Sequence, residues 1–206
     1  MGTVAAAIVR RIVQVSQGPD RPEALLASVG LEPRADVAGH LDEQVDEDAY
    51  YALLERAAGD DDHGLPFRYG DAIRPDDLGA LGLALKTAPT VADALRRLVR
   101  YILVLSDTLA YELTDSRSGQ VLALVGRPHH RRGALAAVTT MIRRSAATRF
   151  VPREVSFRHA APPTERHHRD FFGCAVRFGA ERNGLQLETA ALAQRMVLAD
   201  EGLSAY

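Results

Sequence analysis

The sequence predicts an α+β fold in which a helical N-terminal half packs on a small, mostly antiparallel sheet. Apolar residues recur at helical spacing through residues 4–105, and the pattern changes to alternation near Ser106. The segments that follow have the order β-β-α-β-α-β-β. Since 206 residues suit one domain, we expect a single unit over 1–206, with a helical subregion of about 1–105 and an α/β subregion of about 106–200.

The helical half begins with a segment whose apolar residues share one face, which predicts a helix docked along that face. These residues are Val4, Ile8, Ile12 and Val15. A short helix follows, with Pro22 near its first turn and Gly30 at its end. Asp46 is the predicted N-cap of the next helix, because its carboxylate can accept hydrogen bonds from the first free amides. The predicted buried stripe of that helix comprises Tyr50, Leu53, Leu54 and Ala57.

A charged break at residues 59–63 precedes another helical stretch at 64–73. The next predicted helix contains Gly79 and Gly82, each of which costs about 1 kcal/mol relative to alanine in a helix interior. We therefore expect this helix to pack closely against a neighbouring segment.

The clearest helix follows Thr90, which forms a capping-box pattern with Asp93. Its apolar face is predicted to comprise Val91, Leu95, Leu98, Val99, Ile102 and Leu105. Arg96, Arg97 and Arg100 lie away from this face. Without aromatic partners or a known motif they indicate a solvated edge and not a nucleic-acid interface.

The C-terminal half begins with a predicted hairpin over residues 109–125, because apolar residues alternate on both sides of the turn sequence "TDSRSG". Helical periodicity returns in "HRRGALAAVTTMIRRSAATRF", and "REVSFRHAAPP" alternates as a strand until two prolines end it. The remaining elements are a helix in "TERHHRDFFG", strands in "AVRF" and "GLQL", and a helix over 189–193.

Composition and charge narrow the classes of function. The formal net charge of −2 provides no overall attraction to nucleic acid or to an anionic membrane. A single cysteine cannot form an internal disulfide, which fits a reducing compartment. Arg10 and Arg11 interrupt the first apolar stretch, so we expect no signal peptide, and the most apolar window is far shorter than the roughly 20 residues that span a bilayer. We therefore expect a soluble, cytoplasmic protein without a membrane partner.

No combination of residues predicts catalysis. Cys174 lies between a glycine and an apolar strand, and its expected role is that of a small buried hydrophobe, the alternative being a nucleophile. The pairs His129–His130 and His167–His168 lack the i, i+4 spacing of a helical metal site. The sequence contains no glycine-rich phosphate loop and no G-x-S-x-G motif. We predict neither an enzyme nor a bound metal or cofactor.

Three segments together resemble the N-terminal effector domain of AraC-type transcriptional regulators, in the subgroup called arabinose-binding-like. They are "LGALGLALKTAPTVADALRRLVRYILVLSD", "VPREVSFRHAAPP" and "FFGCAVRFGAERNGLQLETAALAQRMV", in the order that the family has them. The resemblance covers residues from about 25 to about 199. It implies a bacterial regulatory domain that binds a small-molecule effector, forms a homodimer, or does both. Members of the family contact DNA through a following helix-turn-helix domain, which we do not expect within residues 1–206.

The resemblance also implies a structural role for residues 169–187. By analogy, Phe172 and Gly173 end a helix, whereas Val176 and Phe178 fill the core. The expected tight connection to the last strand contains Gly179 and Asn183. Gly184 and Gln186 depart from the family, which usually carries bulkier or more apolar strand residues at these two positions.

For the effector we expect an apolar cleft between the sheet and the N-terminal helices, with a few polar groups that orient the ligand. The candidate polar residues are Tyr101, Tyr111, His130, Arg158 and His159. An arginine in the wall would favour a carboxylate or phosphate. Alternatively, Arg158 and His159 are hydrogen-bonding residues at a strand end, and Tyr101 is a core residue. The competing functions are a dimerisation module without a ligand and a small cytoplasmic enzyme that uses Cys174 or a histidine.

Overall fold

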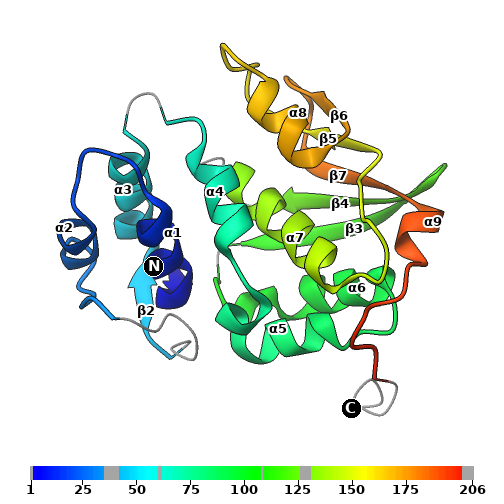
Figure 1. Cartoon of the computed structure of the whole chain (residues 1–206), viewed down its shortest axis with the longest axis horizontal. Coiled ribbons are helices and arrows are strands. Elements are labelled where there is room, and N and C mark those ends of the chain that lie inside the picture. The colour runs from blue at the N-terminus through cyan, green and yellow to red at the C-terminus, as the bar shows by residue number, and fades with distance from the viewer. Residues whose placement is uncertain (1, 35–41, 60–61, 108, 126–130, 201–206) are drawn as a thin grey trace.

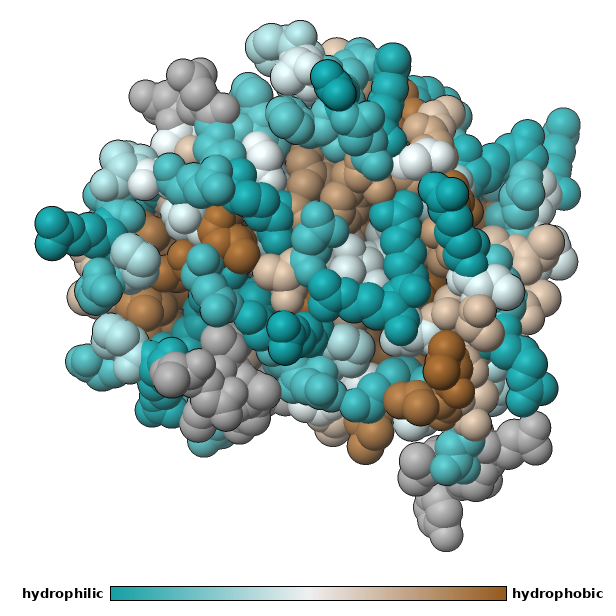
Figure 2. Space-filling view, in the orientation of Figure 1, coloured by the Kyte–Doolittle hydropathy of each residue, from teal (hydrophilic) through white to brown (hydrophobic). Residues whose placement is uncertain are grey.

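The computed structural model of the chain describes residues 2–34, 42–59, 62–107, 109–125 and 131–200. A layer of N-terminal helices lies at one end, a group of central helices follows, and a five-stranded sheet lies at the other end (Figure 1). Hydrophilic residues are spread over the face shown in Figure 2, and hydrophobic ones gather there in a few smaller areas. The architecture is the α+β class that the sequence predicts.

The N-terminal unit consists of two short strands and three helices: β1 (Thr3–Ala5), α1 (Ala6–Val15), α2 (Pro22–Ala27), β2 (Gln44–Asp46) and α3 (Glu47–Ala58). Asp46 caps α3 as predicted, because its Oδ1 accepts hydrogen bonds from the amides of Asp48 and Ala49. The position of Val4 in a helix was predicted wrongly. Val4 lies in β1, opposite Val45 of β2, and a three-residue strand is too short to show an alternating pattern.

The central helices are α4 (Leu65–Ala72), the 3-10 helix η1 (Pro75–Leu78), α5 (Gly79–Lys86), α6 (Val91–Tyr101) and the 3-10 helix η2 (Ile102–Val104). Thr90 caps α6 as predicted, accepting a hydrogen bond of 3.2 Å from the amide of Asp93. The predicted close packing near Gly82 is also confirmed. A Cβ atom at Gly82 would lie only 1.6 Å from the carbonyl oxygen of Pro75.

The C-terminal half has the predicted order of elements. They are β3 (Ala110–Ser116), β4 (Gly119–Val125), α7 (Arg131–Ser145), β5 (Glu154–Ser156), α8 (Arg166–Phe172), β6 (Ala175–Arg177), β7 (Asn183–Glu188) and α9 (Thr189–Leu192). The sheet has the strand order β3-β4-β7-β5-β6, and β5 and β6 form its one parallel pair among the described strands. In Figure 1, α7 crosses in front of the sheet and α8 lies near β5 and β6.

The segment from α8 to β7 has the expected structural role. Phe172 is fully buried, and Gly173 ends α8 in the left-handed conformation with a φ of 68°. Phe178 packs, partly buried, against the core. The departure at Gly184 has a steric basis, since a Cβ atom there would lie 3.0 Å from the carbonyl oxygen of Leu122. Gln186 is used as a polar contact, and its Nε2 donates to Ser116 Oγ at 2.7 Å.

Candidate ligand-binding cavity

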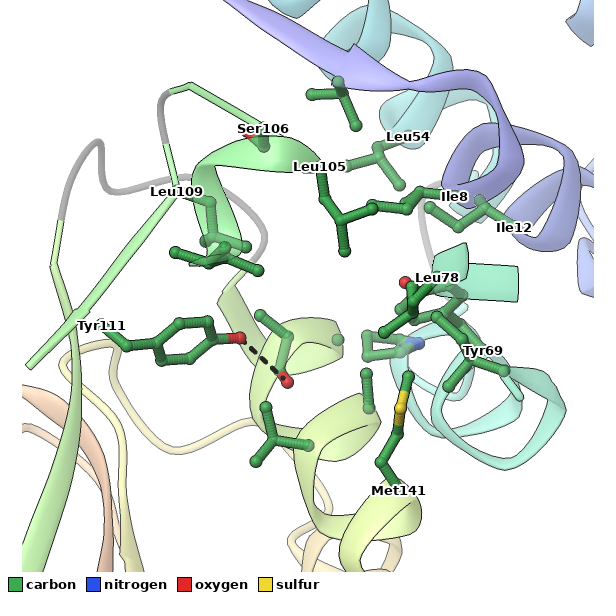
Figure 3. Close-up of a pocket in the computed structure, with 18 of the residues that line it drawn as sticks. Ile8, Ile12, Leu54, Tyr69, Leu78, Leu105, Ser106, Leu109, Tyr111 and Met141 are labelled. Atoms are coloured by element: carbon green, nitrogen blue, oxygen red, sulfur yellow. Dashed lines mark hydrogen bonds between the residues drawn. The ribbon is translucent and has the colours of Figure 1, made fainter. Parts of the chain in front are cut away.

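A cavity of about 530 Å³ lies where the N-terminal unit, the central helices and strand β3 meet (Figure 3). Helices α1 and α3 form the wall on one side. On the other side are α4, α6 with η2, α7 and the first residues of β3. The volume falls in the range of about 300–1,000 Å³ that is usual for small-molecule sites. An opening of this size at a junction of layers is therefore able to hold a small molecule.

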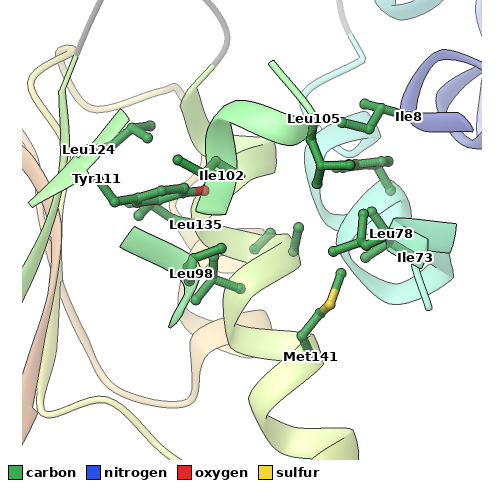
Figure 4. Close-up of a cluster of buried hydrophobic side chains, with 14 of the residues drawn as sticks. Ile8, Ile73, Leu78, Leu98, Ile102, Leu105, Tyr111, Leu124, Leu135 and Met141 are labelled. Carbon is green, nitrogen blue, oxygen red and sulfur yellow. The ribbon is translucent and has the colours of Figure 1, made fainter. Parts of the chain in front are cut away.

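Most of the cavity wall is apolar. Ile8 and Ile12 of α1 and Leu54 of α3 line it from the N-terminal unit, while Leu105 and Met141 line it from the other side. Several of these side chains belong to the main hydrophobic core, which continues toward Leu98, Ile102 and Leu135 (Figure 4). The wall therefore matches the apolar part of a ligand and is held in place by the packing of the whole domain.

Three tyrosines line the cavity from three different elements: Tyr50 from α3, Tyr69 from α4 and Tyr111 from β3. Burial raises the pKa of each phenol, and the neighbouring Tyr50 raises the pKa of Tyr69 and Tyr111 further. All three side chains are therefore neutral at physiological pH and can donate a hydrogen bond.

The three hydroxyl groups differ in their partners. The Tyr111 hydroxyl donates to the backbone oxygen of Ala134 at 3.4 Å, which is the dashed line in Figure 3. Within the described part of the chain, neither the Tyr50 nor the Tyr69 hydroxyl has a hydrogen-bond partner. Neither oxygen is sealed off by protein atoms, so both remain accessible to a molecule in the cavity.

The charged residues among the described wall residues are acidic. Glu55 is exposed, and Asp62 is paired with the guanidinium of Arg68, whose Nη1 lies 3.0 Å from Asp62 Oδ1. The hydrogen bonds from Arg68 hold the pKa of Asp62 below its usual value. His63 also lines this part of the cavity. No arginine or lysine is among the described residues that line it.

An ion pair ties the N-terminal unit to the central helices beside the cavity. The guanidinium of Arg11 in α1 donates to both carboxylate oxygens of Asp77 in η1, at 2.6 and 2.9 Å. Both side chains are largely buried, and Asp77 also accepts a hydrogen bond from the amide of Arg74. Its neighbour Leu78 lines the cavity, so this ion pair helps to set the distance between two of the cavity walls.

Of the residues predicted for the site, the structure places Tyr111 in the cavity wall. Tyr101 is 40% exposed at the end of α6, where the guanidinium of Arg100 lies over its ring. Arg158 is exposed, and its amide donates to Asn183 Oδ1 at 2.9 Å. His159 packs beside the ring of Phe157.

These three residues are not among the described residues that line the cavity. His130 lies outside the described residues. Tyr50 and Tyr69 were not predicted as site residues. Tyr50 belongs to the predicted buried stripe of α3, and a tyrosine in such a stripe is the available signal for a polar group near the core.

The surroundings of Cys174 and of the possible metal ligands do not favour the chemistry considered for them. Burial raises the pKa of the Cys174 thiol to about 11, so the thiolate is scarce at neutral pH. Among the described residues, no group of three or more His, Cys, Asp or Glu side chains is arranged to hold a metal ion. None of the described helices combines the length and the apolar character needed to cross a membrane.

The fold is therefore that of an α+β domain with a cavity between its layers. Residues 21–196 match the model of the arabinose-binding domain that forms the N-terminal part of AraC transcription regulators. Because the match covers most of the chain, the protein belongs to this family. The fold is also similar to the crystal structure of the transcriptional regulator CdpR from Pseudomonas aeruginosa.

That structure superimposes with a TM-score of 0.66 and 15% sequence identity, over 95% of this chain and 59% of the CdpR chain. This chain thus spans little more than half of the length of CdpR. No curated protein matches the sequence.

Proposed function

We propose that this chain, over 1–206, is one effector-sensing unit of an AraC-type transcriptional regulator, and that the cavity is the effector site. The observation that supports this most directly is the position of the cavity, between the N-terminal unit and the rest of the domain. A molecule that contacts both sides stabilises one arrangement of the two relative to others. The resulting population shift would be transmitted to an attached helix-turn-helix domain.

The proposal includes no catalytic step, and it locates the protein in the bacterial cytoplasm, where its DNA target lies. The raised pKa of Cys174 supports a role without nucleophilic chemistry. If the chain were an enzyme that uses this thiol, Cys174→Ser would abolish turnover. A sensor domain would bind its effector equally well with either residue.

A thermal-shift screen against a small-molecule library tests the proposal. Ala137 is buried and lines the cavity from α7, so Ala137→Phe should fill part of the space. Ala52 is exposed on α3, and Ala52→Phe is the matched control. A ligand at 100 times its Kd adds about 2.7 kcal/mol of stability, which for a domain of this size raises Tm by roughly 5–10 °C.

We expect at least one compound to raise the Tm of the wild type and of Ala52→Phe but not that of Ala137→Phe. If no compound acts, or if compounds act equally on all three proteins, the cavity is not the effector site. A uniformly negative screen would favour the dimerisation module.

Dimerisation is a second role that the surface supports. Several large apolar side chains are more than half exposed in the single chain: Leu103, Val104, Val197 and Leu198. Such side chains are frequent in contacts between subunits. Light scattering coupled to size exclusion, over a range of protein concentrations, tests whether the purified chain forms a homodimer. A monomer at all concentrations would refute this role.

A further inference from the structure

We propose that the effector is an uncharged molecule with an apolar body and an acceptor oxygen, bound by the hydroxyl groups of Tyr50 and Tyr69. This inference rests on the proposed function, because it specifies the ligand of the same cavity. It differs from the carboxylate or phosphate that an arginine in the wall would have favoured.

The charges of the described wall residues favour an uncharged ligand over an anionic one. An ionised carboxylate that leaves water needs a cationic or strongly donating partner to offset the lost hydration. Among the described wall residues there is no arginine or lysine, and Arg158 is exposed outside the cavity. Glu55 adds negative charge, whereas the charge of Asp62 is balanced by its pairing with Arg68. Against these described residues an anionic ligand would therefore lose its hydration without gaining a cationic partner.

The phenols offer what an uncharged oxygen requires. Tyr69 is only 8% exposed, yet its hydroxyl has no partner among the described residues. This hydroxyl opens into the cavity, so a ligand oxygen can accept its hydrogen bond and gain the net stabilisation of one such bond. Burial keeps the phenol protonated, so it serves as a donor.

Tyr50 provides a second open hydroxyl from the opposite layer. It lies in α3 of the N-terminal unit, whereas Tyr69 lies in α4, and both side chains line the same cavity. One carbonyl oxygen has two lone pairs and can accept from two donors. A ligand that accepts hydrogen bonds from both tyrosines would therefore link the N-terminal unit to the central helices.

Isosteric probes test the ligand class. The first pair is 2-acetylnaphthalene, a neutral acceptor, and 2-naphthoate, its anionic counterpart; the second pair is 2-decanone and nonanoate. Calorimetric titration measures the Kd of each for the wild type and for the variants Tyr50→Phe and Tyr69→Phe. Tyr101→Phe is the matched control, because Tyr101 is exposed and is not among the described wall residues. Circular dichroism verifies that each variant is folded.

We expect at least one ketone to bind the wild type, with the matching carboxylate at least tenfold weaker. Loss of one hydroxyl should weaken ketone binding about 2- to 12-fold, the range of a single net hydrogen bond, and Tyr101→Phe should leave it unchanged. Carboxylates that bind as tightly as ketones, or ketone binding that is unaffected by both cavity variants, would overturn the ligand class.

The two proposals fail in different ways. If no ketone binds but the library screen finds a ligand that Ala137→Phe blocks, this ligand class is wrong and the effector site stands. If that screen also finds nothing, the effector site itself is refuted.

Discussion

Substitution of Gly82 by alanine tests the packing of α5 against η1, the 3-10 helix that carries the cavity residue Leu78. Gly82 lies in the middle of α5, which packs against η1, and the alanine Cβ would lie 1.6 Å from the carbonyl oxygen of Pro75. The obstructing atom belongs to the backbone, so no side-chain rotation relieves the overlap. The substitution must displace η1, which carries both Asp77 and the cavity residue Leu78.

The expected loss of stability is the difference between two effects. Forcing an extra methyl group into a packed site costs up to about 3 kcal/mol. Alanine recovers about 1 kcal/mol relative to glycine in a helix interior. The net change in the free energy of unfolding is therefore a loss of up to about 2 kcal/mol, which corresponds to a Tm lower by up to roughly 4–8 °C.

Urea denaturation followed by circular dichroism measures this change. Gly133→Ala in α7 is the matched control, because the nearest atom to its Cβ would be Tyr69 Cδ1 at 3.4 Å, an ordinary contact. The control should be neutral or more stable by up to about 1 kcal/mol. If Gly82→Ala is as stable as Gly133→Ala, the close contact between α5 and η1 does not exist in solution.

Three further substitutions or reactions have defined outcomes. Asp77→Asn should lower the free energy of unfolding by about 3–5 kcal/mol in urea denaturation, because it leaves the largely buried guanidinium of Arg11 without its charged partner; a loss below about 1 kcal/mol would mean that the pair is solvated. Thr90→Ala should cost about 1 kcal/mol by the same assay, since it removes the acceptor for the amide of Asp93, and an unchanged stability would contradict the cap. The thiol of Cys174 should react slowly with Ellman's reagent at pH 8 and faster as the pH rises toward about 11, because only the thiolate attacks. A rate at pH 8 equal to that of the unfolded chain would refute the raised pKa.

Prediction from the sequence was most successful where the determining interactions are local. The helix caps at Asp46 and Thr90 depend on residues within three positions, and both were predicted correctly. The order of strands and helices after Ser106 follows from hydrophobic periodicity and turn residues, which are also local. In contrast, the pairing of β1 with β2 joins segments about forty residues apart through only three residues each. Strands this short have no alternating hydrophobic pattern from which the pairing could be predicted.

The sequence by itself determined which positions are apolar, where most helices and strands begin and end, and which family the chain resembles. The tertiary structure decided which apolar side chains surround an unfilled space and which polar groups open into it. Tyr50, Tyr69 and Tyr111 come from a helix of the N-terminal unit, a central helix and a strand, and each alone has the pattern of a core residue. A cavity is the space that remains after distant segments have packed, so it depends on all their contacts together and leaves no pattern in any single segment.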